Sequence, residues 1–482
     1  MPPRGSLRSS SITRLDSGRM RAMGDWVPDL SQPMSVHVIG VGGAGMSAIA
    51  EVLTTMGHSV SGSDLKASSG LDRLSALGVD VRVGHAADNL GDVTFVTRST
   101  AVPDGNAECR EAVERGLPLL SRAEVLGAVS TLRNTVAVAG THGKTTTSSM
   151  LALVLREAGF RPSFVIGGDV NEIGTGAAWD EGDLFVVEAD ESDNSFLKLS
   201  SRFGVVTNLE PDHLERHGGF QPLVGAFDQF VDAVDGPVVV GSDDPEGAAL
   251  AARHATETVG TADAADWMIS AVQESWEGVR FRLTGPVGES LEITLPVPGL
   301  HNARNAAAAA AIAYRIGADP EAVVGALARF GGVARRFEHR GQADGVTFVD
   351  DYAHLPTEVA ATVETSQAGG FGRIVSVFQP HRYSRTEALW SSFGRAFDGS
   401  DVLFVTDVYS SGEAPRPGVS GRLIVDAVLR DSPGSDVRYV ERRDDLLDAL
   451  VGELRDGDLC LTMGAGDLTS VPDDLRQRFH DS

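Results

Sequence analysis

Short apolar runs that end in glycine or a polar residue recur along the chain, and each precedes a segment with the apolar spacing of a helix. They lie at residues 36–39, 136–139, 184–187, 204–207, 346–349, 374–378 and 402–406. This alternation is typical of β and α units that build mostly parallel sheets. Because ligands of such sheets bind outside the carboxyl ends of the strands, the polar residues just after each run are the first candidates for chemistry.

Two other patterns divide the chain. Residues 267–295 alternate apolar and polar positions, which predicts antiparallel strands inserted in the middle of the chain. The alanine run at residues 306–311 continues a helix that opens near Asn302, and tight packing is a sufficient explanation for it. Turn-like residues at 131–134 and at 331–332 mark two boundaries, and 482 residues are too many for one core. We therefore expect three domains.

Composition and charge exclude several classes of protein. Hydrophobic residues make up 42% and charged residues 22%, as in globular domains. No apolar run reaches the ~20 residues of a membrane span and the first residues lack a signal peptide, which predicts a cytoplasmic protein. The net charge of −26 argues against binding to nucleic acid or an anionic membrane. Cys109 and Cys460 lack partners at ligand spacing, so both are predicted to be buried thiols.

The first chemical motif is a glycine-rich turn, Gly40-Val-Gly-Gly-Ala-Gly45, between an apolar run and a helix-like segment. Asp64 follows at the spacing where an acidic side chain holds a ribose hydroxyl, so a nicotinamide or flavin site is one interpretation. The glycines indicate that the backbone approaches a diphosphate closely, but they do not identify the nucleotide. A different nucleotide diphosphate and a plain glycine turn both fit the same pattern.

The second motif, Gly140-Thr-His-Gly-Lys-Thr-Thr146, lies between a predicted strand and an amphipathic helix. It departs from the full phosphate-loop consensus because Val138 stands where the first glycine belongs. The expected binding mode does not depend on that glycine: loop amides and Lys144 would hold the β- and γ-phosphates, and Thr145 would ligate magnesium. The alternative, a chance turn with a surface lysine, does not explain the flanking strand and helix.

Two strand tips carry hard-metal ligands. They are Glu188-Ala-Asp-Glu-Ser-Asp193 and Asn208-Leu-Glu-Pro-Asp-His213. Magnesium prefers few carboxylates together with phosphate oxygens. Glu188 is the best single candidate because it directly follows an apolar strand, while an exposed acidic loop is the alternative, above all for Glu191.

In this order, the motifs resemble those of the Mur ligases, three-domain ATP-dependent amide ligases of peptidoglycan synthesis. The resemblance runs from about residue 35 to the C-terminus and includes His301-Asn-x-x-Asn305 and Arg335-Arg-Phe-Glu338. Within the family, Asp350-Asp-Tyr-Ala-His354 and Phe378-Gln-Pro-His-Arg-Tyr-Ser-Arg-Thr386 look like the branch that adds L-alanine to UDP-N-acetylmuramate.

The Ser, Arg and Pro content of residues 1–34 and their lack of apolar periodicity predict a disordered extension or an overcalled start, and no function is assigned to this segment. For the rest of the chain the resemblance implies an α/β fold of three domains. These are a Rossmann-like UDP-sugar-binding domain at 35–132, a central P-loop ATPase-like domain at 133–332, and a C-terminal Rossmann-like amino-acid-binding domain at 333–482. It also implies ATP and Mg²⁺ as cofactors, UDP-N-acetylmuramate and L-alanine as substrates, and a monomer or homodimer. The expected processes are cell wall biogenesis, cell shape, cell cycle and division.

The same resemblance assigns roles to individual residues. Lys144, Glu188 and His213 would be catalytic, with Thr145, Glu188 and His213 at the metal. ATP would contact Gly140, Thr141, His142, Gly143, Lys144, Thr145, Thr146, His301, Asn302, Asn305, Arg336 and Asp351. The UDP sugar would contact Gly42, Gly43, Gly45 and Asp64, and L-alanine would contact Tyr352, His381, Arg382 and Arg385. Arginine recognises a carboxylate with two parallel hydrogen bonds, which fits the last set, although an exposed basic face is the alternative.

Three departures from the family pattern are visible. Leu355 stands where a second histidine is usual, so that position receives no role, and Ser410-Ser-Gly-Glu413 replaces Pro-Ala-Gly-Glu. No lysine follows Lys198. The carbamylated lysine of relatives that act later in the pathway is therefore impossible here, which fits the alanine-adding branch.

The predicted reaction is attack of the lactyl carboxylate on the ATP γ-phosphate, followed by attack of the alanine amine on the acyl phosphate. Closure of the third domain over ATP would bring Arg336 and Asp351 to the nucleotide. Three rivals remain: a ligase that transfers a whole tripeptide to the same sugar nucleotide, a nicotinamide oxidoreductase, and a nucleotide-gated binding module. The oxidoreductase leaves Lys144 and Glu188 unexplained.

Overall fold

The computed structural model describes residues 26–192 and 194–480, and its N-terminal third is a five-stranded parallel sheet of order β3-β2-β1-β4-β5. The strands are β1 (Ser35–Ile39), β2 (Ser59–Asp64), β3 (Asp80–Val83), β4 (Phe95–Arg98) and β5 (Leu119–Ser121). The helices are α1 (Ala44–Thr55), α2 (Ser69–Ala76), α3 (Ala107–Glu114) and α4 (Arg122–Ser130). The predicted strand at residues 36–39 is confirmed as β1, and its carboxyl end leads directly into the glycine-rich turn.

The segment before this sheet differs from the prediction. Residues 1–25 lie outside the described part of the chain, but residues 26–34 pack on the first domain. Leu30 is only 3% exposed and belongs to the core, and the ring of Trp26 lies 5.7 Å from that of Phe95. The prediction of disorder is therefore wrong for residues 26–34, because isolated apolar side chains in a polar segment cover the edge of the core.

The central third contains a ten-stranded sheet of order β15-β14-β13-β12-β11-β10-β6-β9-β7-β8. Its strands are β6 (Asn134–Ala139), β7 (Ser163–Val170), β8 (Thr175–Ala178), β9 (Leu184–Glu188), β10 (Ser201–Val206), β11 (Val238–Gly241), β12 (Glu257–Gly260), β13 (Trp267–Ser275), β14 (Gly278–Thr284) and β15 (Ser290–Leu295). Its helices are α5 (Lys144–Glu157), α6 (Leu214–His217), α7 (Phe220–Asp232), α8 (Pro245–His254), α9 (Leu300–Ile316) and α10 (Pro320–Leu327). The carboxyl ends of β6, β9 and β10 lie side by side because these three strands are parallel neighbours.

The antiparallel strands predicted at residues 267–295 are confirmed as β13, β14 and β15. Along β14 the side chains of Val279, Phe281 and Leu283 are buried while those of the intervening arginines are exposed, which explains the alternation in the sequence. The alanine-rich helix α9 packs against α5 and against this part of the sheet, and Ala306 to Ala311 are buried. The packing explanation for the alanine run is therefore confirmed.

The C-terminal third forms a six-stranded sheet of order β16-β17-β21-β18-β19-β20, in which only the edge strand β16 is antiparallel. The strands are β16 (Glu338–Ala343), β17 (Val346–Asp351), β18 (Arg373–Phe378), β19 (Val402–Val405), β20 (Val437–Tyr439) and β21 (Asp458–Met463). The helices are α11 (Pro356–Gln367), α12 (Tyr383–Leu389), α13 (Arg422–Asp431), α14 (Arg443–Glu453) and α15 (Val471–His480).

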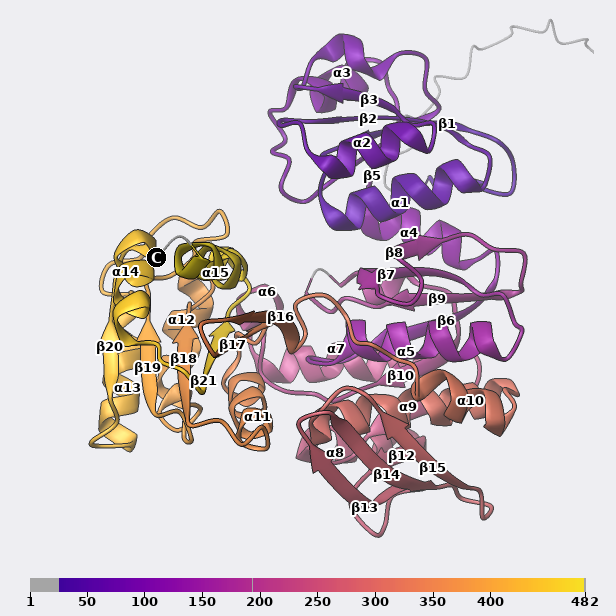
Figure 1. Ribbon diagram of the computed structural model, residues 1–482. Coiled ribbons are helices and arrows are strands. Elements are labelled where there is room, and N and C mark those ends of the chain that lie inside the picture. The colour runs from indigo at the N-terminus through magenta and orange to yellow at the C-terminus, as the bar shows by residue number, and fades with distance from the viewer. Residues whose placement is uncertain (1–25, 193, 481–482) are drawn as a thin grey trace, which may run out of the picture.

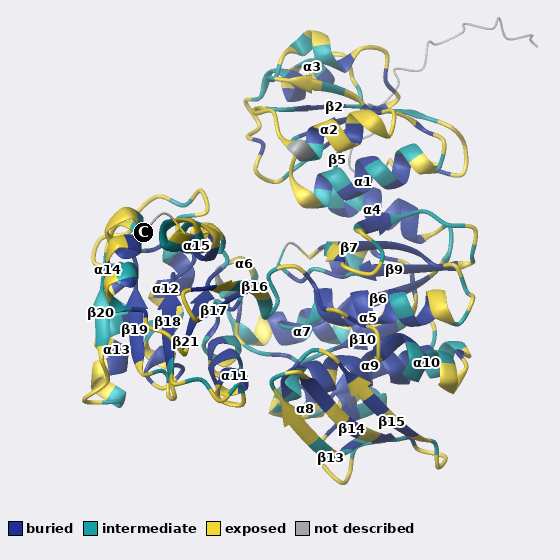
Figure 2. Cartoon of the chain, in the orientation of Figure 1, coloured by how far each residue is buried: buried dark blue, intermediate teal, exposed yellow. Residues whose placement is uncertain are grey.

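The central domain contacts both other domains (Figure 1). Helix α1 of the N-terminal domain packs against β7 and β8 of the central domain. At the same contact Arg73 donates a hydrogen bond to Thr175 (2.9 Å). The C-terminal domain stands beside the central one, with α11 turned toward it. The central strands of the sheets are buried, whereas exposed residues lie on loops, on outer helix faces and on one face of the antiparallel strands β13 to β15 (Figure 2). Cys109 and Cys460 are buried free thiols, as predicted, and no helix among the described residues is long and apolar enough to cross a membrane.

Candidate active site

The phosphate loop connects β6 to α5 and requires glycine at two positions. Gly140 has φ +133° and Gly143 has φ +77°, both in the region that favours glycine. A Cβ on Gly140 would lie 2.0 Å from Thr207 Oγ1, and one on Gly143 would lie 2.3 Å from Asn305 Oδ1. The loop is thus pressed against two neighbouring segments, and the free amides at the start of α5 face the site, as in anion-binding helix termini.

Lys144 is held in this loop by acceptors on three sides. Its Nζ donates to the carbonyls of Gly140 (2.5 Å) and Thr141 (3.2 Å) and forms an ion pair of 2.7 Å with Glu191. Burial opposes the charge on Lys144, but nearby carboxylates, first that of Glu191, outweigh it and raise the pKa of the ammonium. Burial raises the pKa of Glu191 to about 7. The exposed-loop interpretation of Glu191 is wrong, because the residue is 2% exposed.

Thr145 and Glu188 form the part of the site that suits a hard cation. The Thr145 hydroxyl lies 3.0 and 3.1 Å from the two carboxylate oxygens of Glu188, so an ion between them would meet both ligands. Mg²⁺ prefers few protein oxygens together with phosphate oxygens, and the oxygens of Thr145 and Glu188 fit this preference. His213 has a buried Nδ1 without a hydrogen-bond partner, and its Nε2 faces Asp212 and Arg385. Among the described residues no three acidic, histidine or cysteine side chains converge as a complete metal site.

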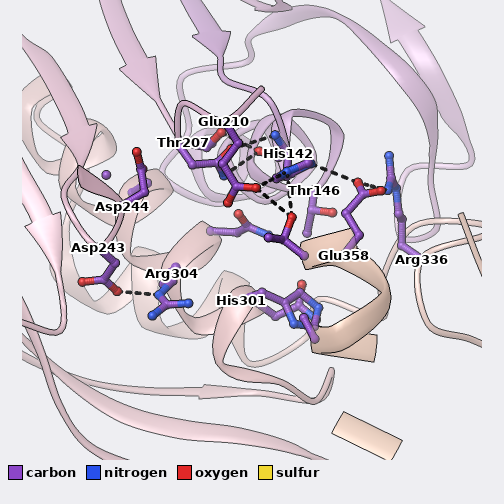
Figure 3. A pocket seen from close by; sticks show the side chains of 18 of the residues that line it. His142, Thr146, Thr207, Glu210, Asp243, Asp244, His301, Arg304, Arg336 and Glu358 are labelled. Atoms are coloured by element: carbon purple, nitrogen blue, oxygen red, sulfur yellow. Dashed lines mark hydrogen bonds and ion pairs between the residues drawn. The ribbon is translucent and has the colours of Figure 1, made fainter. Parts of the chain in front are cut away.

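A cavity of about 250 Å³ adjoins the phosphate loop (Figure 3). It unites predicted ATP contacts from three parts of the chain. These are His142, Gly143, Thr146, His301, Asn302, Asn305, Arg336 and Asp351. Burial lowers the pKa of His301 to about 4, so the imidazole is neutral at pH 7. Burial also raises the pKa of Asp351 to about 6, although its carboxylate accepts hydrogen bonds from the amides of Phe337 and Ala353.

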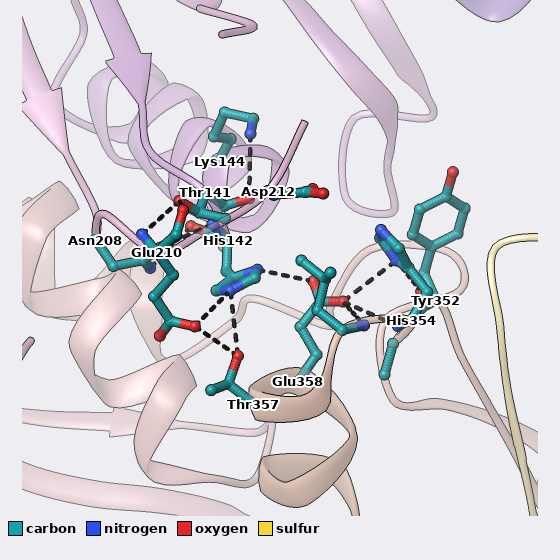
Figure 4. A network of polar contacts seen from close by, with 12 residues as sticks. Thr141, His142, Lys144, Asn208, Glu210, Asp212, Tyr352, His354, Thr357 and Glu358 are labelled. Atoms are coloured by element: carbon teal, nitrogen blue, oxygen red, sulfur yellow. Dashed lines mark hydrogen bonds and ion pairs between the residues drawn. The ribbon is translucent and has the colours of Figure 1, made fainter. Parts of the chain in front are cut away.

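His142 joins the phosphate loop to two other segments (Figure 4). Its Nε2 lies 3.2 Å from Glu210, which follows β10, and its Nδ1 lies 3.2 Å from Glu358 in the first turn of α11. Thr357, also in α11, donates a hydrogen bond of 2.7 Å to Glu210. Sequence reasoning placed Glu210 in a strand tip with metal-ligand residues but not at His142, and it missed Thr357 and Glu358, because only the fold brings these distant residues to the loop.

The glycine-rich turn of the first domain has the geometry of a nucleotide loop. The Gly42 amide donates to Asp64 Oδ2 at 2.9 Å, and a Cβ on Gly42 would meet the same oxygen at 2.9 Å. Gly43 caps α1, whose first residues are Ala44 and Gly45. The turn therefore leaves the α1 N-terminus and one Asp64 oxygen available to a ligand, which accords with the predicted UDP-sugar contacts.

Arg122 is a second residue that sequence reasoning missed. A Cβ on Gly45 would lie 2.8 Å from Arg122 Nε, so the guanidinium adjoins the glycine-rich turn. That Nε is buried without a hydrogen-bond partner. Burial opposes the charge on half-buried Asp190, beside the phosphate loop, but Lys144, the amide and hydroxyl of Ser192 and then Arg122 keep its pKa below the usual range. Arg122 thus places a guanidinium, whose Nε has no hydrogen-bond partner among the described residues, between the first-domain turn and the phosphate-loop region.

The four predicted alanine contacts lie in one cluster of rings and cations. His354 connects the rings of Tyr352 (5.4 Å) and His381 (5.9 Å), and His381 stacks on Tyr409 at 5.6 Å. Burial lowers the pKa of His354 to about 4 and that of His381 to about 3, so both rings are neutral at pH 7. Arg382 adopts φ +68° at the start of α12, and its buried Nε has no hydrogen-bond partner.

Arg385 is engaged with the central domain. Its Nε and a terminal nitrogen approach the two carboxylate oxygens of Asp212 at 3.0 and 3.2 Å, and another lies 3.1 Å from His381 Nδ1. Both partners are almost fully buried. Burial opposes the charge on Asp212, but Arg385 and then His213 lower the pKa of the carboxyl to about 2. The Arg385–Asp212 ion pair therefore connects the C-terminal domain to the strand tip after β10.

Three family models together match most of the chain. Residues 35–133 match the Mur ligase family, catalytic domain, residues 138–313 the Mur ligase middle domain, and residues 335–466 the Mur ligase, glutamate ligase domain. The chain belongs to the Mur ligase family. This confirms the resemblance, and with it the three-domain α/β fold of an ATP-dependent ligase.

Individual Mur ligases are similar over nearly the whole chain. UDP-N-acetylmuramate–L-alanine ligase of Thermobifida fusca is 46% identical, covering 90% of this chain and 94% of that protein. The protein of the same name from Kineococcus radiotolerans is 47% identical, with the same coverage. The crystal structure of UDP-N-acetylmuramate-alanine ligase from Thermotoga maritima matches with a TM-score of 0.79 at 29% identity, over 93% of this chain and 99% of that one. A murein peptide ligase from Psychrobacter arcticus shares the fold, with a TM-score of 0.69 at 22% identity.

Proposed function

We propose that this Mur ligase joins L-alanine to the lactyl carboxylate of UDP-N-acetylmuramate, with conversion of ATP to ADP and phosphate, in the synthesis of peptidoglycan precursors. One observation carries the proposal: relatives that bear this activity in their name are 41–47% identical over at least 90% of the chain. The convergence of the phosphate loop with the ring-and-arginine cluster of the C-terminal domain supports it, since an amide ligase needs an activating phosphate beside an amino-acid site.

The first step activates the sugar nucleotide. An oxygen of the lactyl carboxylate bonds to the γ-phosphorus while the bond to the β,γ-bridging oxygen breaks, which gives an acyl phosphate and ADP. Such a transfer needs in-line positioning and neutralised charge more than a protein nucleophile. The amides at the start of α5 and the ammonium of Lys144 supply positive charge to the phosphates, and burial beside α9 keeps water from them.

Magnesium fits the oxygens of Thr145 and Glu188, with His213 as a further candidate. When bound there, the ion would neutralise phosphate charge and orient the γ-phosphate. Because the pKa of His213 is lowered, first by burial, the imidazole is available as a neutral ligand or hydrogen-bond partner. The Thr145 hydroxyl already donates to the Glu188 carboxylate, which aligns the two side chains.

The second step forms the amide. The alanine amine attacks the acyl carbon, inorganic phosphate leaves, and the amine loses one proton. Arg382 is the better candidate for the alanine carboxylate because its Nε lacks a partner, whereas Arg385 is already bound to Asp212. The neutral imidazoles of His354 and His381, together with the ring of Tyr352, form a compact wall beside these arginines, suited to a small amino acid.

Several finer features belong to the same proposal. We place the enzyme in the cytoplasm, as a monomer or homodimer that contacts neither nucleic acid nor membrane. The proposed domain boundaries are 35–132, 133–332 and 333–482, which agree with turns between the three sheets.

The proposal is tested by phosphate release from ATP and Mg²⁺ with UDP-N-acetylmuramate, in parallel reactions with L-alanine, with the stem tripeptide and without an acceptor. We expect release only with L-alanine, together with an amide product of the matching mass. Preference for the tripeptide would assign the enzyme to recycling. Absence of release in every reaction would contradict the ligase function.

Replacement of Arg122 by glutamine is predicted to raise the KM for UDP-N-acetylmuramate about 10- to 100-fold, the value of one charge-assisted contact. The guanidinium lies beside Gly45, where the diphosphate would meet the α1 N-terminus. The KM for ATP should stay within about twofold, because the ATP cavity is not lined by Arg122. Steady-state kinetics in both substrates measure the effect.

Arg110→Gln is the matched control, since Arg110 is an exposed arginine of the same domain on α3. It removes the same charge and should leave both KM values unchanged. An equal response of the two variants, or an unchanged sugar-nucleotide KM in Arg122→Gln, would exclude a contact between Arg122 and the substrate.

A further inference from the structure

His142 has a charged partner on each ring nitrogen, and the two partners come from different domains. Nε2 lies 3.2 Å from Glu210 of the central domain, and Nδ1 lies 3.2 Å from Glu358 of the C-terminal domain. A neutral imidazole carries one N–H and one lone pair, so it can donate toward only one carboxylate. Nδ1 makes no hydrogen bond to Glu358, but both carboxylates lie within ion-pair distance of the ring, so the site favours the protonated, positively charged imidazole (Figures 3 and 4).

Glu358 has a second function that fixes its position. Its Oε2 accepts hydrogen bonds from the backbone amides of His354 (2.9 Å) and Leu355 (3.1 Å), so it caps the start of α11. The other oxygen, Oε1, faces His142 at 3.2 Å and Arg336 at 3.8 Å. His354 Nδ1 lies 3.2 Å from Oε2. The carboxylate that binds the phosphate loop is thus rigidly attached to the C-terminal domain.

The central-domain side of the network is equally well defined. Glu210 Oε2 is shared by His142 Nε2 and the hydroxyl of Thr357, which lies next to Glu358 in α11. The charged groups that face the imidazole are therefore Glu210, from the loop after β10, and Glu358, with Arg336 behind it. Two residues after His142 along the chain, Lys144 begins α5. A shift of His142 would consequently move the backbone that positions Lys144.

We propose that His142 is a positioning residue whose imidazolium couples the phosphate loop to the docking of the C-terminal domain, so that docking takes up a proton. This inference rests on the proposed ligase function, since docking completes the site where acyl phosphate meets alanine. His142 need not touch a reacting atom: it aligns the loop that carries Lys144 with the helix that carries Glu358. The phosphate loop and α11 then behave as one unit with a docked and an undocked state.

The direction of the pH dependence follows from the charges. Burial disfavours the charged ring, but the carboxylates of Glu358 and Glu210 outweigh it and raise the pKa of His142 to about 9. When α11 undocks, the ring loses Glu358 and its pKa falls toward the usual 6.5. The ion pair between His142 and Glu358 stabilises docking fully at pH values below the pKa of the undocked ring. This stabilisation is lost as pH rises through about 9, the pKa of the docked ring. Alkaline pH should therefore favour the undocked state.

Docking is measured by fluorescence energy transfer between dyes on the central and C-terminal domains of the full chain. Val287 (79% exposed, after β14) and Leu429 (45% exposed, in α13) are suitable sites for Val287→Cys and Leu429→Cys. The native thiols do not compete for dye, because Cys109 and Cys460 are 2% and 0% exposed. The samples contain a non-hydrolysable ATP analogue and UDP-N-acetylmuramate, at pH values from about 7 to 9.5, around the titration expected for the ring.

In the dye-labelled parent, transfer efficiency should change continuously over this pH range as the domains undock. His142→Asn and Glu358→Gln should give the undocked value with little pH dependence, and each should raise the KM for ATP about tenfold. Glu358→Gln keeps an oxygen for the α11 cap, so it removes the charge but spares the helix. Glu364→Gln, at an exposed position of the same helix, is the control and should behave like the parent.

A parent profile that is flat over this range would overturn the proposal, and so would an unchanged profile in His142→Asn. Loss of the profile in Glu364→Gln would also overturn it, because the effect would then come from helix charge in general. A merely structural role would lower thermal stability without removing the pH dependence. The transfer signal requires no turnover, so failure of the coupling and failure of the ligase function are observed separately.

Discussion

Lys144→Ala is expected to reduce ATP-dependent ligation by about 10³-fold or more, the range seen when a cation that stabilises phosphoryl transfer is removed. Lys144 is the cation of the phosphate loop, and its Nζ is already directed by the carbonyls of Gly140 and Thr141. Loss of this charge should affect kcat more than the KM for ATP, because charge develops on the transferred group. Phosphate release under saturating substrates measures the effect.

The structure identifies a complication that a control can remove. Lys144 forms a buried ion pair with Glu191, and removal of one partner of such a pair destabilises a protein by about 3–5 kcal/mol when the other charge remains. Because burial already raises the pKa of Glu191 to about 7, this carboxyl can take up a proton at neutral pH and limit the loss. Lys144→Ala/Glu191→Gln should recover the melting temperature but not turnover. Recovery of turnover in the double variant would mean that Lys144 is structural.

Local sequence patterns were sufficient to predict the strand, loop and helix that form the proposed phosphate-binding site. The strand before the loop, the loop glycines and the helix after it are adjacent in the sequence, so their geometry depends on nearby residues. Glu188 could also be predicted, since it is the first polar residue after an apolar strand that neighbours β6. Alternation of exposed and buried side chains likewise predicted β14 and its partners.

The contacts between domains could not be predicted in this way. Glu210 and Glu358 reach His142 only after two sheets have folded and one domain has docked, and no local periodicity encodes that placement. Arg122 was missed because it opens an ordinary helix with a capping box, and its proximity to Gly45 depends on the position of β5 beside β4. Burial of Glu191 was missed because the sequence shows an acidic run without its buried partner.

Arg385 illustrates how a correct motif can still leave a function open. The resemblance places it at the alanine carboxylate, and a guanidinium suits that ligand. In the structure the same guanidinium already binds the two oxygens of Asp212. The sequence gives the chemical capacity of the side chain, but which carboxylate it binds depends on domain docking.

Asp212→Asn is expected to reduce kcat/KM for L-alanine about 10²- to 10³-fold, because it leaves the charge of Arg385 buried without a partner. Removal of one member of a buried ion pair destabilises a protein by about 3–5 kcal/mol. Because this pair joins two domains, we expect the loss to weaken docking of the C-terminal domain. The pKa of Asp212 is depressed to about 2, so the pair contributes fully above the ordinary pKa of an aspartate and is lost only as pH falls through about 2. Above about pH 5 the effect of the substitution should be independent of pH.

A double-mutant cycle with Arg385→Gln separates the pair from other roles of the arginine. If Arg385 acts only through Asp212, the double variant should be no worse than either single variant, whereas a direct alanine contact would make Arg385→Gln the more damaging change in KM for alanine. Glu387→Gln is the matched control, since its partner Arg416 and Glu387 itself are 44% and 56% exposed and such pairs contribute about 1 kcal/mol or less. An Asp212→Asn enzyme as active as this control would contradict the docking role, because a buried charge pair between two domains cannot be neutral to both binding and turnover.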